Sequence, residues 1–84
     1  MPRRYPSKGK LIKVYWDDVT GHINSYAKRA KPAPAISVGY LHSEHEDYIV
    51  IASSYFLETV KDEDAREGDF TALPKGMITK VEVL

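Results

Sequence analysis

The sequence contains no cysteine, no long apolar run and no glycine-rich phosphate loop. Without cysteine there is no disulfide and no thiolate ligand for structural zinc, and three scattered histidines are a poor substitute. Without about 18 consecutive apolar residues, no segment can cross a membrane as a helix. The opening MPRRYPSKGK also lacks the apolar stretch of a secretory signal. These absences predict a protein of the cytoplasm.

Catalytic patterns are absent as well. No Gly-x-Ser-x-Gly elbow surrounds Ser53 or Ser54. The adjacent carboxylates of Asp17 and Asp18 diverge on a strand, whereas acid–base work needs convergent groups. We interpret His42 and its acidic neighbours as a solvated hairpin tip rather than a metal site. The sequence therefore predicts no enzyme, no cofactor and no metal.

The chain is short enough for one domain. Its 84 residues predict a single unit over 1–84, with residues 1–7 as a flexible arm and a thin core. The net charge is zero, but residues 1–31 carry +6 (8 basic minus 2 acidic) and residues 32–84 carry −6 (4 minus 10). This asymmetry favours nucleic acid on the basic half or self-association of opposite surfaces. The alternative is that the two halves interleave and their charges mix.

Apolar alternation predicts about five strands and no large helix. Residues 8–17 alternate with period two, and residues 35–56 form a hairpin interrupted by Gly39, where we expect a bend. A tight turn with Gly76 at positive φ leads into a last strand. The fold class is therefore all-β, a small closed or nearly closed barrel of five strands. The expected buried residues are Trp16, Val38, Tyr40, Val50 and Val81.

Two segments have less regular patterns. Residues 22–30 (HINSYAKRA) are compatible with one short helix that ends before Pro32, or with a long basic excursion. Residues 58–69 are strongly charged and contain a glycine, which is typical of an exposed loop.

Four stretches resemble a known family: residues 14–18 (VYWDD), 38–41 (VGYL), 47–51 (DYIVI) and 73–78 (LPKGMI). Their order is similar to that of Sm-like or Src-homology-3-like small barrels. Their amino-acid sequences resemble those of a group of small uncharacterised proteins of bacteriophages, cyanophages among them. The resemblance implies a homo-oligomeric ring, RNA as ligand and the host-cell cytoplasm as location. Sm-like proteins typically carry an Asn in the hairpin between the second and third strands, and residues 42–47 contain none. They also carry Arg-Gly or Lys-Gly near the turn between the fourth and fifth strands, and Lys75 with Gly76 is a partial counterpart of this basic-Gly pair.

Tyrosines beside basic residues are typical of sites for single-stranded nucleic acid. We expect RNA or single-stranded nucleic acid on the basic half. Further tyrosines, at positions 40, 48 and 55, are available for stacking or for a subunit interface, where tyrosine is enriched. The alternative function is a phage structural or protein–protein interaction component without a nucleic-acid role. The candidate nucleic-acid site consists of Lys10, Lys13, Tyr15, Tyr26, Lys28, Arg29 and Lys31.

Overall fold

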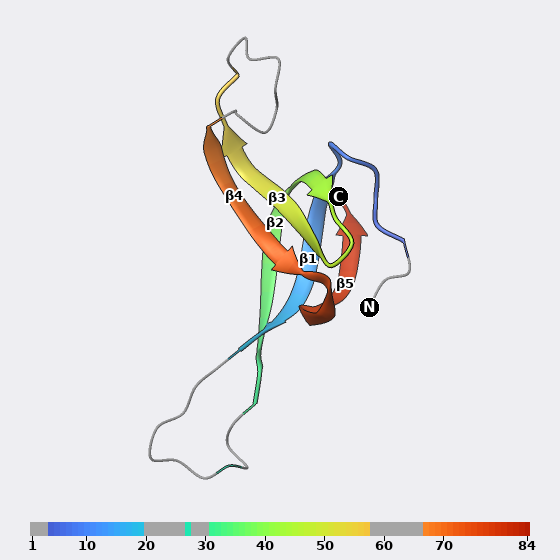
Figure 1. The fold of residues 1–84 in the computed structure, drawn as a ribbon, viewed down its shortest axis with the longest axis vertical. Coiled ribbons are helices and arrows are strands. Elements are labelled where there is room, and N and C mark those ends of the chain that lie inside the picture. Colours follow the sequence, from blue (N-terminus) through green and yellow to red (C-terminus); the bar gives the residue numbers. More distant parts are fainter. Residues whose placement is uncertain (1–3, 20–26, 28–30, 58–66) are drawn as a thin grey trace.

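Five strands and one short helix make up the described part of the chain (Figure 1). The computed structural model describes residues 4–19, 27, 31–57 and 67–84. The helix expected at residues 22–30 and most of the loop expected at 58–69 lie outside these ranges. The elements are β1 (Leu11–Asp18), β2 (Ala33–Glu44), β3 (Tyr48–Tyr55), β4 (Gly68–Pro74), the 3-10 helix η3 (Lys75–Met77) and β5 (Ile78–Val83).

The strands form one antiparallel sheet in the order β4-β3-β2-β1-β5. The prediction of an all-β fold with five strands is confirmed. The prediction of a closed barrel is not, because no ladder joins β4 to β5 among the described residues, so the sheet stays open.

The open sheet is nevertheless strongly coiled, because η3 joins its two edge strands. Pro74 and Ile78 are four residues apart, so their Cα atoms lie at most about 15 Å from each other (4 × 3.8 Å). In a flat sheet of five strands the two edges are about 19 Å apart (4 × 4.8 Å). The sheet must therefore curl until its edges approach each other, which creates a concave inner face and a convex outer face.

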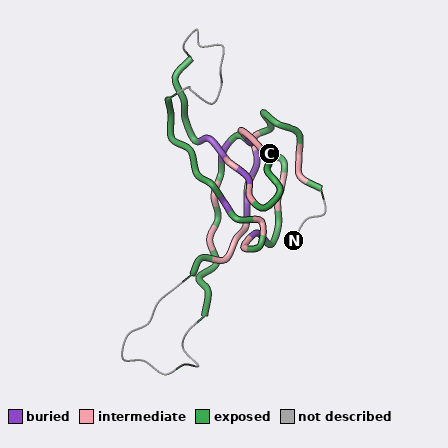
Figure 2. Tube along the Cα trace, viewed as in Figure 1, coloured by how far each residue is buried: buried purple, intermediate pink, exposed green. Residues whose placement is uncertain are grey.

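The core lies on the inner face (Figure 2). Ile12 and Val14 alternate with outward residues along β1 and are fully buried. Every strand adds at least one aliphatic side chain, and the described residues place no buried polar side chain among them. Trp16 packs against this cluster from one side, and its Nε1 donates a hydrogen bond to Ser37 Oγ at 3.0 Å. The core cluster is Ile12, Val14, Leu41, Ile49, Ile51, Leu73 and Ile78.

The predicted core was partly wrong, because two strands turn the opposite face inward. Val38 is 48% exposed and Tyr40 is 44% exposed, whereas Leu41 is buried. Alternation separates a strand into two sets of side chains but does not say which set faces the core. The ladder decides, since Ile12 and Val14 lie opposite Gly39 and Ser37. Of the other expected core residues, Trp16, Val50 and Val81 are half-buried.

Gly39 marks the closest approach of two strands. A Cβ at this position would lie 2.8 Å from the Ala52 carbonyl oxygen and 3.2 Å from its carbonyl carbon. The predicted importance of this glycine thus has a steric cause, and the register shift of β2 against β3 follows between Leu41 and Ser43. The expected positive φ at Gly76 is wrong. Among the described glycines only Gly9 has one, at 90°.

We expect Gly39→Ala to lower the free energy of unfolding by about 1–3 kcal/mol, because the new methyl group meets backbone that cannot rotate away. Gly76→Ala is the matched control, since its Cβ would meet nothing within 4 Å. Urea denaturation followed by Trp16 fluorescence measures both. Equal stability of the two variants would contradict the close strand crossing.

A second comparison tests which face is inside. Ile49→Ala removes a fully buried side chain and should cost about 2–5 kcal/mol. Val38→Ala removes a side chain that is 48% exposed and should change stability by no more than about 1 kcal/mol. The same denaturation experiment applies. If Val38→Ala were the more damaging substitution, the assignment of faces in β2 and β3 would be wrong.

Candidate functional site

The residues predicted to bind nucleic acid do not converge in the described part of the chain. Tyr26, Lys28 and Arg29 lie outside the described residues. Lys10 lies at one end of the β1–β2 ladder, where its carbonyl accepts from Leu41 N–H at 2.9 Å. Lys31 precedes the other end. The eight residue steps from Ala33 to Leu41 span about 27 Å, so these two lysines lie far apart.

Lys13 and Tyr15 are the predicted residues that do meet. Both project from the outer face of β1, and the Lys13 ammonium lies 5.3 Å from the centre of the Tyr15 ring. Lys80 of β5 pairs with Tyr15 in the ladder and places its own ammonium 5.5 Å from the same ring. Both distances fall within the range of cation–π attraction. Sequence reasoning did not include Lys80, because the β1–β5 ladder pairs Tyr15 with a residue 65 positions further along the chain.

An ion pair neutralises part of this cluster. Lys80 Nζ lies 2.8 Å from Glu82 Oε1. The hydrogen bond between them raises the pKa of the Lys80 ammonium and lowers the pKa of the Glu82 carboxyl, so both groups are charged at neutral pH. Glu82 also lies opposite Lys13 in the ladder. The cluster around Tyr15 therefore carries two cations and one anion.

A second cluster of rings forms a hollow on the outer face of β2, β3 and β4. Tyr40, Ala52 and Phe70 lie side by side across these strands. Ala52 is small and 1% exposed, because larger neighbours rise around it. The resulting space is a shallow hollow that opens to solvent. We call it the aromatic hollow and define it by Tyr40, His42, Ala52, Tyr55 and Phe70, with Lys8, Gly9 and Leu41 completing the lining.

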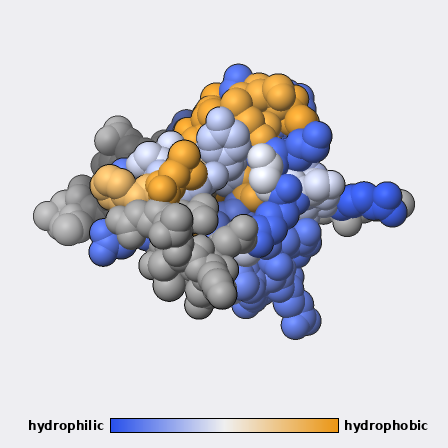
Figure 3. All heavy atoms as spheres, turned by 90° about the horizontal axis from the view of Figure 1, so that it is seen from above, coloured by the Kyte–Doolittle hydropathy of each residue, from blue (hydrophilic) through white to orange (hydrophobic). Residues whose placement is uncertain are grey.

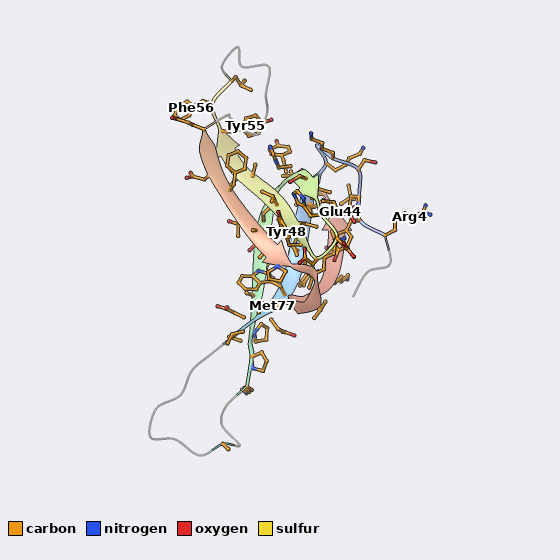
Figure 4. The ribbon with its side chains drawn as sticks, viewed as in Figure 1. Arg4, Glu44, Tyr48, Tyr55, Phe56 and Met77 are labelled. Carbon is orange, nitrogen blue, oxygen red and sulfur yellow. The ribbon has the colours of Figure 1, made fainter. Side chains whose placement is uncertain are left out.

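The side chains that line the aromatic hollow are partly exposed, and two of their rings contact each other. The rings of His42 and Phe70 meet edge to face, with centroids 5.1 Å apart and an interplanar angle of 71°. Tyr55 lies near the end of the β3 strand, beside Phe56 (Figure 4). The residues Tyr40, Tyr55 and Phe70 are 37–44% exposed, so a ligand in the hollow can reach them. Sequence reasoning missed this hollow, because its rings come from three strands.

Apolar side chains continue from the aromatic hollow along β2. Ile36 is 56% exposed and Val38 is 48% exposed, and both share the outer face with Tyr40. Viewed from above, apolar side chains gather in patches next to hydrophilic surface rather than being evenly scattered (Figure 3). A row of exposed apolar side chains on one strand is typical of an interaction surface.

Lys75 has a structural place in the molecule. Its ammonium lies 2.7 Å from Glu44 Oε2 and 4.9 Å from the Tyr5 ring centre, and its side chain is only 12% exposed. Burial raises the pKa of the Tyr5 hydroxyl. The Lys75 N–H donates to the Asp47 carbonyl at 2.8 Å. Lys75 thus holds η3 against the β2–β3 hairpin, whereas Gly76 is exposed.

Ser43 lies between two imidazoles at the hairpin. Its Oγ is 3.4 Å from His42 Nδ1 and 3.1 Å from His45 Nε2, and the His45 ring stacks on Tyr48 at 4.3 Å. Neither Ser43 nor His45 lines the aromatic hollow. Over the part of the chain that the structure describes, no three His, Asp or Glu side chains come together as metal ligands.

No helix in the described ranges is long and apolar enough to cross a membrane. No family model, no curated protein and no solved structure matches this chain.

Proposed function

We propose that this chain is a non-enzymatic binding module built on an Sm-like or Src-homology-3-like small barrel of the phage type. The strand order β4-β3-β2-β1-β5 and the one-turn link from β4 to β5 support this assignment. The coiled sheet and the shared inner core support it as well.

The ligand that the geometry supports best is a segment of another protein. The aromatic hollow carries this proposal, because rings around a small apolar floor fit an apolar or aromatic side chain. Burying one such side chain contributes about 1.5–3 kcal/mol. Ile36 and Val38 extend the apolar surface beyond the hollow. The phosphates of a nucleic acid require several cations, and the hollow is lined by one lysine, Lys8.

Binding to the aromatic hollow is tested with peptides. Selection from a random short-peptide library against the wild-type chain should enrich sequences with a large apolar or aromatic residue. Phe70→Ala should weaken an enriched peptide by roughly 30-fold, the effect of a binding hot spot. Fluorescence polarisation of the labelled peptide measures this change.

Val83→Ala is the matched control for that experiment, because Val83 is 57% exposed but lies on β5, at the other edge of the sheet. Melting curves establish that both variants fold. A library that enriches nothing, or a peptide held equally well by Phe70→Ala and by the wild type, would rule out the hollow as a protein site.

A second candidate ligand is RNA or single-stranded DNA, and the cluster around Tyr15 favours it. Two ammonium groups flank a ring there, and base stacking on such a ring contributes roughly 1–3 kcal/mol. In this reading the chain forms a homo-oligomeric ring that repeats the weak site around one axis. Within the described ladders the outer edges of β4 and β5 have no partner strand, which leaves two edges available for pairing between copies.

The second candidate predicts retention of labelled single-stranded RNA at about 50 mM salt, where phosphate contacts are strongest. Replacing Lys13 and Lys80, whose ammonium groups flank the Tyr15 ring, by Glu should abolish this binding and leave the oligomer mass unchanged. Light scattering and polarisation provide the two readouts. A mass near 9.5 kDa would exclude the ring, and no retention of RNA by the wild type would exclude the nucleic-acid role.

A further inference from the structure

Half of β2 has an unused hydrogen-bonding edge. Leu41 directs its backbone toward β1, since its N–H donates to the Lys10 carbonyl at 2.9 Å and its carbonyl accepts from Gly9 N–H at 2.8 Å. Backbone groups alternate from side to side along a strand, and the β1–β2 ladder has no register shift. Ile36 and Val38 therefore direct their N–H and C=O groups away from β1.

The neighbour that would use this edge leaves before reaching it. β3 pairs with β2 from Tyr40 to Glu44, and no described ladder continues this pairing to Val38 or Ile36. Beyond Ala52, β3 shifts register and stays with β4 instead. Toward one end of the molecule β2 consequently keeps β1 as its one partner strand in the described ladders, while β3 and β4 run toward the other end (Figure 1). In the described structure no strand pairs with β2 on this side of Ile36 and Val38, and we call this vacant strand position the open lane.

The open lane and the aromatic hollow meet at Tyr40. Tyr40 lines the hollow, and Val38 lies two residues before it, about 7 Å along the strand. The side chains of Ile36, Val38 and Tyr40 all share the outer face. A strand placed in the lane would therefore lie beside an apolar row and reach the hollow within a few residues.

We propose that an extended peptide segment of a partner protein adds to β2 as a strand beside Ile36 and Val38, with an apolar or aromatic anchor in the aromatic hollow. This inference rests on the proposed protein-binding function and specifies how the peptide is held. Main-chain hydrogen bonds orient an added strand, and a pocket for one of its side chains selects its sequence.

Charge at the site specifies the partner further. Lys8 lines the hollow and Lys10 adjoins the same end of β2, whereas Asp17 and Asp18 pair with Pro34 and Ala33 at the far end. Among the described residues that line the hollow, Lys8 is the one lysine and no carboxylate is present. A partner peptide with Asp or Glu next to its apolar anchor would place that carboxylate near the Lys8 ammonium.

A second copy of this chain fits the lane less well. Pro34 has no N–H, so only Ile36 and Val38 can both donate and accept along this edge. In a two-fold pairing centred on Ser37, Pro34 would face Tyr40 of the second copy, whose backbone already pairs with Ala52. Pairing would therefore stop after four hydrogen bonds. A single peptide has no such partner strand and is free to turn into the hollow.

Removing one edge donor tests the strand addition. Val38→Pro deletes an N–H that no described ladder uses, and proline is tolerated on a strand edge whose N–H faces solvent. We expect Val38→Pro to weaken a library-selected peptide by about tenfold, because a peptide carbonyl loses its donor. Val38→Ala, which keeps the N–H, should weaken it by less. Ser37→Pro is the control for direction, since its N–H faces β1 and its loss should unfold the chain.

N-methylation of the peptide backbone tests the same point without altering the protein. Strand addition predicts affinity loss at every second methylated residue near the anchor, and Lys8→Glu should reduce the selection of acidic neighbours. Equal affinity of the methylated peptides, with binding still lost in Phe70→Ala, would overturn strand addition while leaving the hollow as a protein site. A wild-type dimer that Val38→Pro dissociates would overturn it in favour of a second copy. A library that enriches nothing would remove the proposed function itself.

Discussion

The short link η3 is the constraint on which the rest of this molecule depends. It connects two strands at opposite edges of the sheet, and its three residues are too few to span a flat sheet of five strands. The sheet therefore coils, and coiling gives a thin domain an inner face that is enclosed on several sides. Without this curvature the aliphatic residues of the core would line one side of an open sheet, exposed to water.

Coiling also determines where the strands part. At the point where β2 and β3 cross, a methyl group on Gly39 would collide with the Ala52 carbonyl, so the two backbones lie closer than side chains allow. Past this crossing β2 pairs with β1 alone and β3 with β4 alone in the described ladders, so the β1–β2 and β3–β4 hairpins diverge. The hollow around Ala52 and the free edge of β2 both result from this divergence. The candidate binding features are thus consequences of the same geometry that forms the core.

The charged residues divide between structural and surface roles in a way that bears on the ligand. Lys75 is held by Glu44 and packs on Tyr5, so this lysine belongs to the framework of the fold. Lys80 is neutralised in part by Glu82. Among the described cations these contacts lower the positive potential available to a phosphate backbone. The exposed apolar side chains of β2 do not depend on charge to contact a ligand. A protein segment is therefore the first candidate ligand and nucleic acid the second.

The sequence by itself determined the all-β class, the number of strands and several of their positions, because period-two alternation and turn residues are local signals. It also singled out Gly39 as a special position. It did not determine that Leu41, Ile49 and Ile51 face inward while Val38 and Tyr40 face outward, since alternation is symmetric between the two faces and only the ladder with β1 breaks that symmetry. Nor did it reveal the aromatic hollow, the Lys80–Tyr15 contact or the free edge of β2. These join or separate residues distant in the chain, and only the tertiary structure decides which distant strands become neighbours.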